Sequence, residues 1–143
     1  YVAEINNVKF INDSKATLAE STIWAIKNTS SPIILIAGGK DKGVDYKVIL
    51  DLAVKKVKQV ILIGQAKEKI RAELKGFLSV DEAFSLEDAV NKAYLKAKPG
   101  DSVLLSPMCS SFDMFSDYEE RGSCFKKAVF NLAKAKSLYG KKD

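Results

Sequence analysis

The chain has 143 residues, of which 47% are apolar and 29% are charged, and 23 basic against 18 acidic side chains give a formal charge of +5. This length indicates one domain, and the composition excludes collagen, coiled coils and disordered chains. No apolar run approaches the roughly 20 residues that cross a bilayer, and we expect no signal peptide. The absence of histidine excludes Ser-His-Asp and Cys-His catalysis and His-ligated zinc.

The two cysteines, Cys109 and Cys124, fit neither a CxxC motif nor a disulfide framework. They indicate a reducing compartment, so we expect a cytoplasmic protein, with Cys109 packed as a small core residue. The lysines are scattered among acids, and Arg71 and Arg121 are the only arginines. This scatter argues against a lysine-rich nucleic-acid binder, and we expect neither nucleic acid nor membrane as a partner.

The first residues predict a β-hairpin, with strands at 2–5 and 8–11 around Asn6-Asn7, because asparagine tolerates positive φ. Ser14 or Thr17 is expected to cap the helix that follows, with Glu20 completing a capping box. The predicted helices cover 17–28, the segment after Gly43 as far as Lys56, 66–74, 86–97 and 119–138. The remaining predicted strands cover 33–37, 59–63, 77–80 and 102–105.

Helices alternate with short, continuously apolar strands, which is typical of a parallel sheet buried on both faces. We therefore expect an α/β fold with a Rossmann-like, open and mostly parallel sheet of about six strands. The N-terminal hairpin adds one antiparallel strand, and helices cover both faces. Ligands of such sheets bind beyond the carboxyl ends of the strands.

Three unusually polar loops leave such strand ends, at residues 12–17, 38–43 and 106–111. In the first loop, Asp13 can accept hydrogen bonds from a ribose diol, and Lys15 can meet a phosphate or a carboxylate. Thr17 lies near a helix N-terminus, where free backbone N–H groups favour an anion. The alternative is an Asx turn at Asp13-Ser14 followed by a helix cap, which needs no ligand.

In the second loop, Gly38 and Gly39 let the backbone approach a ligand, and Lys40 and Lys42 add positive charge. The loop matches neither GxxxxGK[ST] nor GxGxxG, and an ordinary strand-to-helix turn is the alternative. No other segment carries a phosphate-binding loop, so this chain alone is not expected to cradle a triphosphate.

In the third loop, serines surround Cys109, but without histidine none of these side chains has an activating base. We interpret Ser106, Ser110 and Ser111 as hydroxyl donors to an anionic ligand. The acids that follow lack metal-ligand spacing and complement a helix dipole, so we expect no metal site among Asp113, Asp117, Glu119 and Glu120.

Four segments, taken together, resemble the C-terminal domain of the Mur ligases: NDSKAT at 12–17, GGKDK at 38–42, LLSPMCSSFD at 104–113 and ERGSCF at 120–125. The resemblance runs from about Val8 to about Ala133 and points to the members that add D-glutamate. It implies one domain, residues 1–143, of a three-domain ATP-dependent ligase of peptidoglycan precursor synthesis. Such an enzyme joins D-glutamate to UDP-N-acetylmuramoyl-L-alanine through an acyl phosphate.

Residue by residue, the resemblance implies that Asp13 contacts the nucleotide ribose and that Lys15 acts catalytically where phosphate and amino acid meet. It implies that Thr17, Lys42 and Ser111 hold the D-glutamate carboxylates, with Lys40 as an alternative to Lys42. Tyr118 stands where the family has an aromatic residue that contacts the amino acid through its backbone.

The resemblance also implies ATP and Mg²⁺ as cofactors, bound mainly by the central domain of the enzyme. The N-terminal and central domains are the implied partners, and we expect the 143 residues to fold alone without turning over substrate. A non-catalytic, Rossmann-type nucleotide- or anion-binding module is the alternative function.

Overall fold

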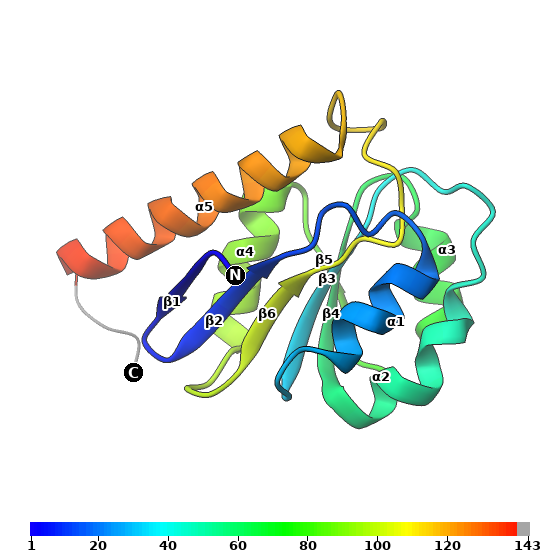
Figure 1. Cartoon of the computed structure of the whole chain (residues 1–143), viewed down its shortest axis with the longest axis horizontal. Coiled ribbons are helices and arrows are strands. Elements are labelled where there is room, and N and C mark those ends of the chain that lie inside the picture. Colours follow the sequence, from blue (N-terminus) through cyan, green and yellow to red (C-terminus); the bar gives the residue numbers. More distant parts are fainter. Residues whose placement is uncertain (140–143) are drawn as a thin grey trace.

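The computed structural model describes residues 1–139, which form one six-stranded sheet between two layers of helices (Figure 1). The strands are β1 Ala3–Ile5, β2 Val8–Asn12, β3 Ile33–Gly38, β4 Val57–Ile63, β5 Val80–Glu82 and β6 Ser102–Leu105. The helices are α1 Ala19–Lys27, α2 Leu50–Lys56, α3 Lys67–Leu74, α4 Leu86–Lys96 and α5 Tyr118–Tyr139, and a 3-10 turn at Tyr46–Ile49 precedes α2.

The strand order is β1-β2-β6-β3-β4-β5, and every neighbouring pair is parallel except β1 with β2. This topology confirms the expected sheet with its single antiparallel strand. Asn6 and Asn7 have φ of 50° and 66°, as the predicted tight hairpin requires.

Two apolar clusters lie on opposite faces of the sheet. Ile34 and Ile36 of β3 belong to the cluster under α4 and α5, and Ile33 and Leu35 belong to the cluster under α1, α2 and α3. Consecutive side chains of a strand point to opposite faces, so a central strand covered on both sides must be apolar throughout. This requirement explains the continuous apolar run that predicted β3.

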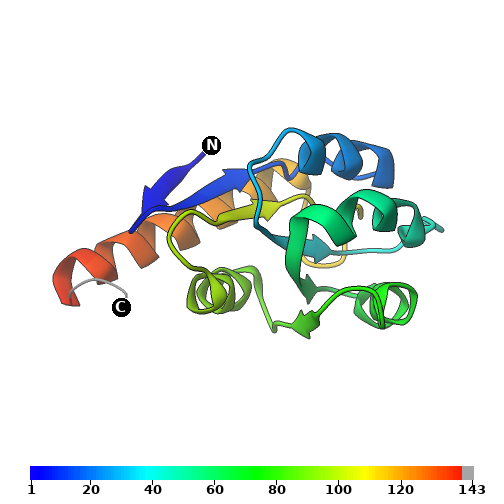
Figure 2. The same ribbon diagram turned by 90° about the horizontal axis from the view of Figure 1, so that it is seen from below.

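The C-terminal helix α5 runs along the sheet and past the β1–β2 hairpin (Figure 2). Val2 and Ala3 pack against the apolar cluster that contains Phe125 and Val129 of this helix. Among residues 1–139, we find no helix with both the length and the hydropathy needed to span a membrane.

The start of the first helix differs from the prediction. α1 begins at Ala19 with Leu18 as its N-cap, and no side chain caps it, so the predicted caps from Ser14 or Thr17 are wrong. The hydroxyl of Ser14 instead donates to the carbonyl of Tyr118 at 2.7 Å. The side chain of Ser14 therefore forms a tertiary hydrogen bond, whereas the local capping rule would assign it to the N-terminus of α1.

The edge strand was also placed wrongly, at 77–80 rather than at Val80–Glu82. The apolar residues suggested a short strand, but Phe77 is 63% exposed and lies before β5. An edge strand has a neighbour on one side only and tolerates acids: Glu82 pairs with Arg71 Nε at 2.8 Å.

The glycines that follow β3 serve close backbone packing. A Cβ on Gly38 would lie 2.0 Å from the carbonyl oxygen of Ile63, and one on Gly39 would lie 2.4 Å from that of Ser110. Both positions have positive φ, which L side chains rarely adopt. The glycines thus let β3 approach its neighbours, whereas the sequence suggested approach to a ligand.

We predict that Gly39→Ala destabilises the fold by about 2–5 kcal/mol, because overpacking adds to backbone strain. Gly76→Ala is the matched control, since Gly76 also has positive φ but nothing lies within 4 Å of its added Cβ. This control should cost only about 1–2 kcal/mol. Urea unfolding of both variants measures the difference, and equal losses would contradict the close-approach argument.

Candidate functional site

The three polar loops meet at the carboxyl edge of the parallel strands (Figure 1). The amide of Met108 donates to the carbonyl of Ala16 at 2.9 Å, which joins the third loop to the first. The amide of Lys40 donates to the carbonyl of Ser110 at 3.0 Å, which joins the second loop to the third. The predicted convergence of these loops is confirmed.

In the first loop, Oδ1 of Asn12 accepts a hydrogen bond from the amide of Ser14 at 3.0 Å. An Asx turn therefore exists, but it begins one residue earlier than the sequence suggested. The turn leaves the carboxylate of Asp13 available for other contacts.

The carboxylate of Asp13 is half-buried and points an acceptor into the site. The hydroxyl of Ser106 donates to its Oδ2 at 3.1 Å, and within residues 1–139 its Oδ1 has no hydrogen-bond partner. Burial raises the pKa of Asp13, while the bond from Ser106 and the charge of Lys15 oppose that rise. Ser106 itself is fully buried. Its hydroxyl donates to Asp13, whereas the sequence suggested that it would donate to a bound anion.

Arg121 is the residue that the sequence analysis missed. It is 1% exposed, and its guanidinium donates to Ser14 Oγ at 2.9 Å, to the Ser14 carbonyl at 2.7 Å and to the Cys109 carbonyl at 3.0 Å. Burial lowers its pKa to about 10. Arg121 thus ties the first and third loops to the start of α5. Its place in the ERG motif was the available signal.

Lys15 and Tyr118 share a cleft of about 400 Å³ between the first loop and the start of α5. Lys15 is exposed, and it also lines two clefts on the other side of the loop, both of them with Asp13. Lys15 therefore lies between Asp13 and the beginning of α5. The complete lining of the first cleft is Asn12, Ser14, Lys15, Tyr118, Glu119, Gly122, Ser123 and Lys126.

Thr17 and Ser111 lie on the first and third loops, close to the joints described above. The amide of Thr17 donates to the Lys15 carbonyl at 2.9 Å, and the Thr17 side chain is partly exposed. Ser111 is 2% exposed, and its carbonyl accepts from the amides of Met114 and Phe115. The backbone around both residues is therefore fixed.

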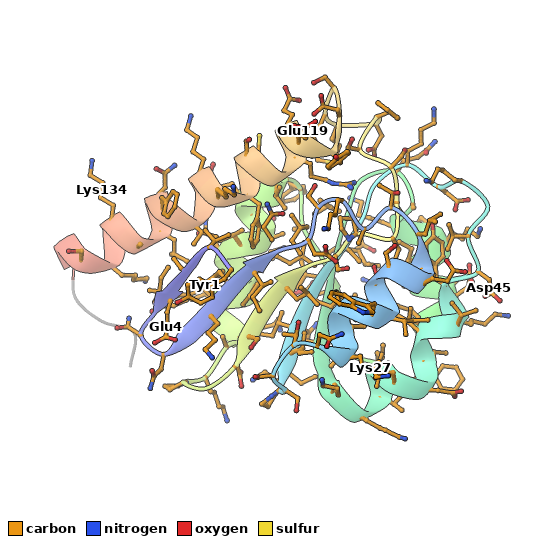
Figure 3. The ribbon with its side chains drawn as sticks, in the orientation of Figure 1. Tyr1, Glu4, Lys27, Asp45, Glu119 and Lys134 are labelled. Atoms are coloured by element: carbon orange, nitrogen blue, oxygen red, sulfur yellow. The ribbon has the colours of Figure 1, made fainter. Side chains whose placement is uncertain are left out.

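Lys42 lies on the outer part of the second loop. It is exposed and forms no hydrogen bond or ion pair with any residue from 1 to 139. Asp41 beside it accepts from Tyr46 at 2.7 Å and pairs with Lys69 at 3.2 Å. Figure 3 shows Asp45, at the end of this loop, far from Glu119 at the start of α5. The structure thus places Lys15 in one cleft with Tyr118 and in two others with Asp13, while Lys42 is an exposed side chain on the second loop.

The acids after the third loop serve the backbone. Asp113 accepts from the amide of Gln65 at 2.8 Å, and Asp117 accepts from the amide of Glu120 at 2.7 Å. Throughout residues 1–139, no three side chains of acids or cysteines are arranged to hold a metal ion.

The two cysteines differ strongly in environment. Cys109 is fully buried beside the Tyr46 hydroxyl, as predicted, and burial raises the pKa of its thiol to about 11. Cys124 is exposed. We predict that a thiol-specific disulfide reagent labels one cysteine in the native chain and both in urea, because reaction needs an accessible thiolate. Loss of native labelling in Cys124→Ser is the check; native labelling of Cys109 would contradict the buried placement.

We predict that Arg121→Lys destabilises the fold by about 3–5 kcal/mol, because one ammonium cannot reach three acceptors and leaves buried oxygens unpaired. Arg71→Lys is the matched control, since Arg71 makes a half-exposed ion pair, and it should cost less than about 1 kcal/mol. Urea unfolding measures both variants. Similar losses would show that the buried contacts of Arg121 add little.

Comparison with known proteins connects this geometry to a family. Residues 1–109 match the family described as "Mur ligase, glutamate ligase domain". A UDP-N-acetylmuramoylalanine–D-glutamate ligase of Caldanaerobacter subterraneus subsp. tengcongensis is 51% identical over 136 residues, which cover 92% of this chain and 30% of that protein. A protein of the same name from Chloroherpeton thalassium is 46% identical over 132 residues, covering 92% and 28%.

One solved structure shares the fold: a domain from a putative UDP-N-acetylmuramate:L-alanyl-gamma-D-glutamyl-medo-diaminopimelate ligase of Haemophilus ducreyi 35000HP. Its TM-score is 0.52 at 14% identity, covering 89% of this chain and 95% of that one. The present chain spans about 30% of the length of the curated relatives. With the family match over residues 1–109 and these identities, the chain belongs to the Mur ligase family and corresponds to its glutamate ligase domain.

Proposed function

We propose that this chain is the C-terminal, amino-acid-binding domain of a three-domain ATP-dependent ligase that adds D-glutamate to UDP-N-acetylmuramoyl-L-alanine. The meeting of the three motif loops around Asp13 and Lys15 is the observation that carries the proposal. The names of relatives at 46–51% identity support it. The reaction would serve peptidoglycan precursor synthesis in the cytoplasm.

In this proposal the residues of the chain orient the reactants and stabilise negative charge on them. Asp13 accepts hydrogen bonds from the ribose hydroxyls through its unpartnered Oδ1. Lys15 lies between that carboxylate and the start of α5, where its ammonium stabilises negative charge at the junction of phosphate and amino acid. Holding the acyl phosphate and the amino acid at the same edge of the sheet supplies the near-attack placement that amide formation needs.

The D-glutamate carboxylates would be held by Thr17, Ser111 and Lys42, with Tyr118 contributing through its backbone. The carbonyl of Tyr118 already accepts from Ser14, which fixes its position. Lys42 is exposed on the second loop, where its ammonium is available to a carboxylate of D-glutamate. ATP, its Mg²⁺ and the UDP-sugar would be bound mainly by the central and N-terminal domains.

We predict that Lys42→Ala and Ser111→Ala, each made in the full-length ligase, raise the KM for D-glutamate about tenfold or more, because each removes a partner of a carboxylate. The KM for ATP should stay within about twofold. Steady-state phosphate release, measured against each substrate in turn, separates the two effects.

Two further variants complete this experiment. Lys40→Ala is the matched control for Lys42→Ala, and a larger effect at Lys40 would move the carboxylate contact to that residue. Asp13→Asn should raise the KM for ATP instead. Equal effects on both substrates would contradict the division of roles, and nucleotide binding without any dependence on D-glutamate would favour a non-catalytic nucleotide-binding module. Turnover by the 143-residue chain alone would contradict the three-domain proposal.

A further inference from the structure

The second loop and the 3-10 turn that follows it are joined by a hydrogen bond between two side chains, from the phenol of Tyr46 to the carboxylate of Asp41. We propose that Tyr46 and Asp41 are positioning residues for the amino acid, which hold Lys42 in a fixed place relative to Ser111 of the third loop. The inference rests on the proposed function, because Lys42 and Ser111 are two of the proposed partners of the D-glutamate carboxylates. Neither Tyr46 nor Asp41 would touch the substrate.

The carboxylate of Asp41 accepts hydrogen bonds from three donors. The Tyr46 hydroxyl donates to Oδ1 at 2.7 Å, and the amide of Gly43 donates to the same oxygen at 3.1 Å. Nζ of Lys69 lies 3.2 Å from Oδ2. The bond from Gly43 closes an Asx turn, with Lys42 at its apex. Both neighbours of Lys42 are therefore held, while its own side chain remains exposed.

Tyr46 gives this turn a rigid support. Its side chain is fully buried in the apolar cluster under α1, α2 and α3. Its amide donates to Oε1 of Glu73 at 3.0 Å, and Nζ of Lys69 lies 5.2 Å from the centroid of its ring. Glu73 and Lys69 both belong to α3, so that helix holds the backbone and the ring of Tyr46. Because a buried phenol requires a partner for its hydroxyl, the core fixes where Asp41 lies.

The same hydroxyl contacts the third loop, where its oxygen lies 3.3 Å from Sγ of Cys109. The carboxylate of Asp41 can only accept, because the bond from Tyr46 holds its pKa below the ordinary value and keeps it ionised at neutral pH. The one proton of the phenol therefore points to Asp41, and the thiol of Cys109 donates to the phenol oxygen. Cys109 lies two residues before Ser111, so the contacts of Tyr46 connect the turn around Lys42 with the segment that carries Ser111.

This network would fix the separation of two carboxylate partners. A site whose partners are held before the ligand arrives loses less conformational entropy on binding, so the loss of positioning weakens affinity. A fixed separation also discriminates between diacids of different length. D-aspartate, which is one methylene shorter than D-glutamate, would fit the fixed pair of partners less well.

Tyr46→Phe removes the hydroxyl and keeps the buried ring. In the full-length ligase we expect it to raise the KM for D-glutamate about threefold to tenfold, which is the loss that one hydrogen bond typically causes. The kcat and the KM for ATP should change less than about twofold. The preference for D-glutamate over a competing D-aspartate should fall about threefold. Steady-state phosphate release, with D-aspartate present or absent, measures these values.

Tyr94→Phe is the matched control. Tyr94 is also a buried tyrosine, and its hydroxyl accepts from Nδ2 of Asn6 at 2.7 Å, but it lies in the cluster on the opposite face of the sheet. Both substitutions should lower the urea midpoint by similar amounts, whereas only Tyr46→Phe should raise the KM for D-glutamate. An equal rise in Tyr94→Phe would assign the effect to lost stability and overturn the positioning role.

Two further comparisons test whether Tyr46 and Asp41 act through Lys42. Asp41→Asn keeps an oxygen that can accept from Gly43 and Tyr46, so it should raise the KM for D-glutamate less than Asp41→Ala does. When Lys42→Ala and Tyr46→Phe are combined, the KM should match that of Lys42→Ala alone, because no ammonium remains to be positioned. Equal effects of the two substitutions at Asp41, or additive effects in the double variant, overturn the proposal.

The outcomes distinguish failure of this inference from failure of the proposed function. An unchanged KM for D-glutamate in Tyr46→Phe, together with a raised KM in Lys42→Ala, overturns the positioning role and leaves the proposed function intact. An unchanged KM in Lys42→Ala contradicts the proposed carboxylate contact itself, and the positioning role fails with it.

Discussion

The buried guanidinium of Arg121 is the interaction on which the site depends. Its three hydrogen bonds reach Ser14 and Cys109, on two loops separated by most of the chain. Within the described part of the chain, no carboxylate lies among its hydrogen-bond acceptors, so desolvation of the charge is offset by charge-assisted bonds to neutral oxygens. The loops are therefore held in one relative position by a group that solvent does not screen.

This anchoring lets the exposed groups act on a rigid backbone. Lys15 directly follows Ser14, whose carbonyl accepts a hydrogen bond from Arg121. Asp13 directly precedes Ser14 and accepts a hydrogen bond from Ser106. Gly39 brings the second loop against Ser110, so the start of that loop is fixed as well. Its outer part is held differently, through Asp41, Tyr46 and Lys69. Exposed charged side chains on loops that a rigid scaffold positions are typical of binding sites.

Most of the fold could be predicted because strand burial and helix periodicity are local signals. β3 is apolar throughout since both faces are covered, and the asparagine pair defines its own turn. The errors occur where a distant contact decides. Ser14 donates to Tyr118 and accepts from Arg121 instead of capping α1. At the edge of the sheet, β5 lies at Val80–Glu82 and includes two acids, whereas the apolar residues had placed the strand at 77–80.

The loops that form the site could be predicted from the sequence, but the long-range contacts that hold their side chains could not. Family motifs pointed to Asp13, Lys15 and Tyr118, and in the structure Lys15 shares one cleft with Tyr118 and another with Asp13. Pattern alone could not show that Ser106 serves Asp13, because that contact joins residues 93 positions apart. Nor could it show that Trp24 and Ser102 line one cleft, since that cleft exists only once α1 packs over β2 and β6.

Two groups in this region, Asp13 and Ser102, oppose folding, and both line a trough of about 490 Å³ between β2 and α1. Burial raises the pKa of Asp13, so the folded chain binds a proton more tightly than the unfolded chain, and this carboxylate lowers stability as pH rises through the window above its ordinary pKa. Most paired carboxylates act in the opposite direction. Ser102 adds to the same trough a buried hydroxyl that has no hydrogen-bond partner among residues 1–139. Natural proteins retain such groups because selection requires only that stability stays above a threshold, and local departures from the rules of folding are expected at functional sites.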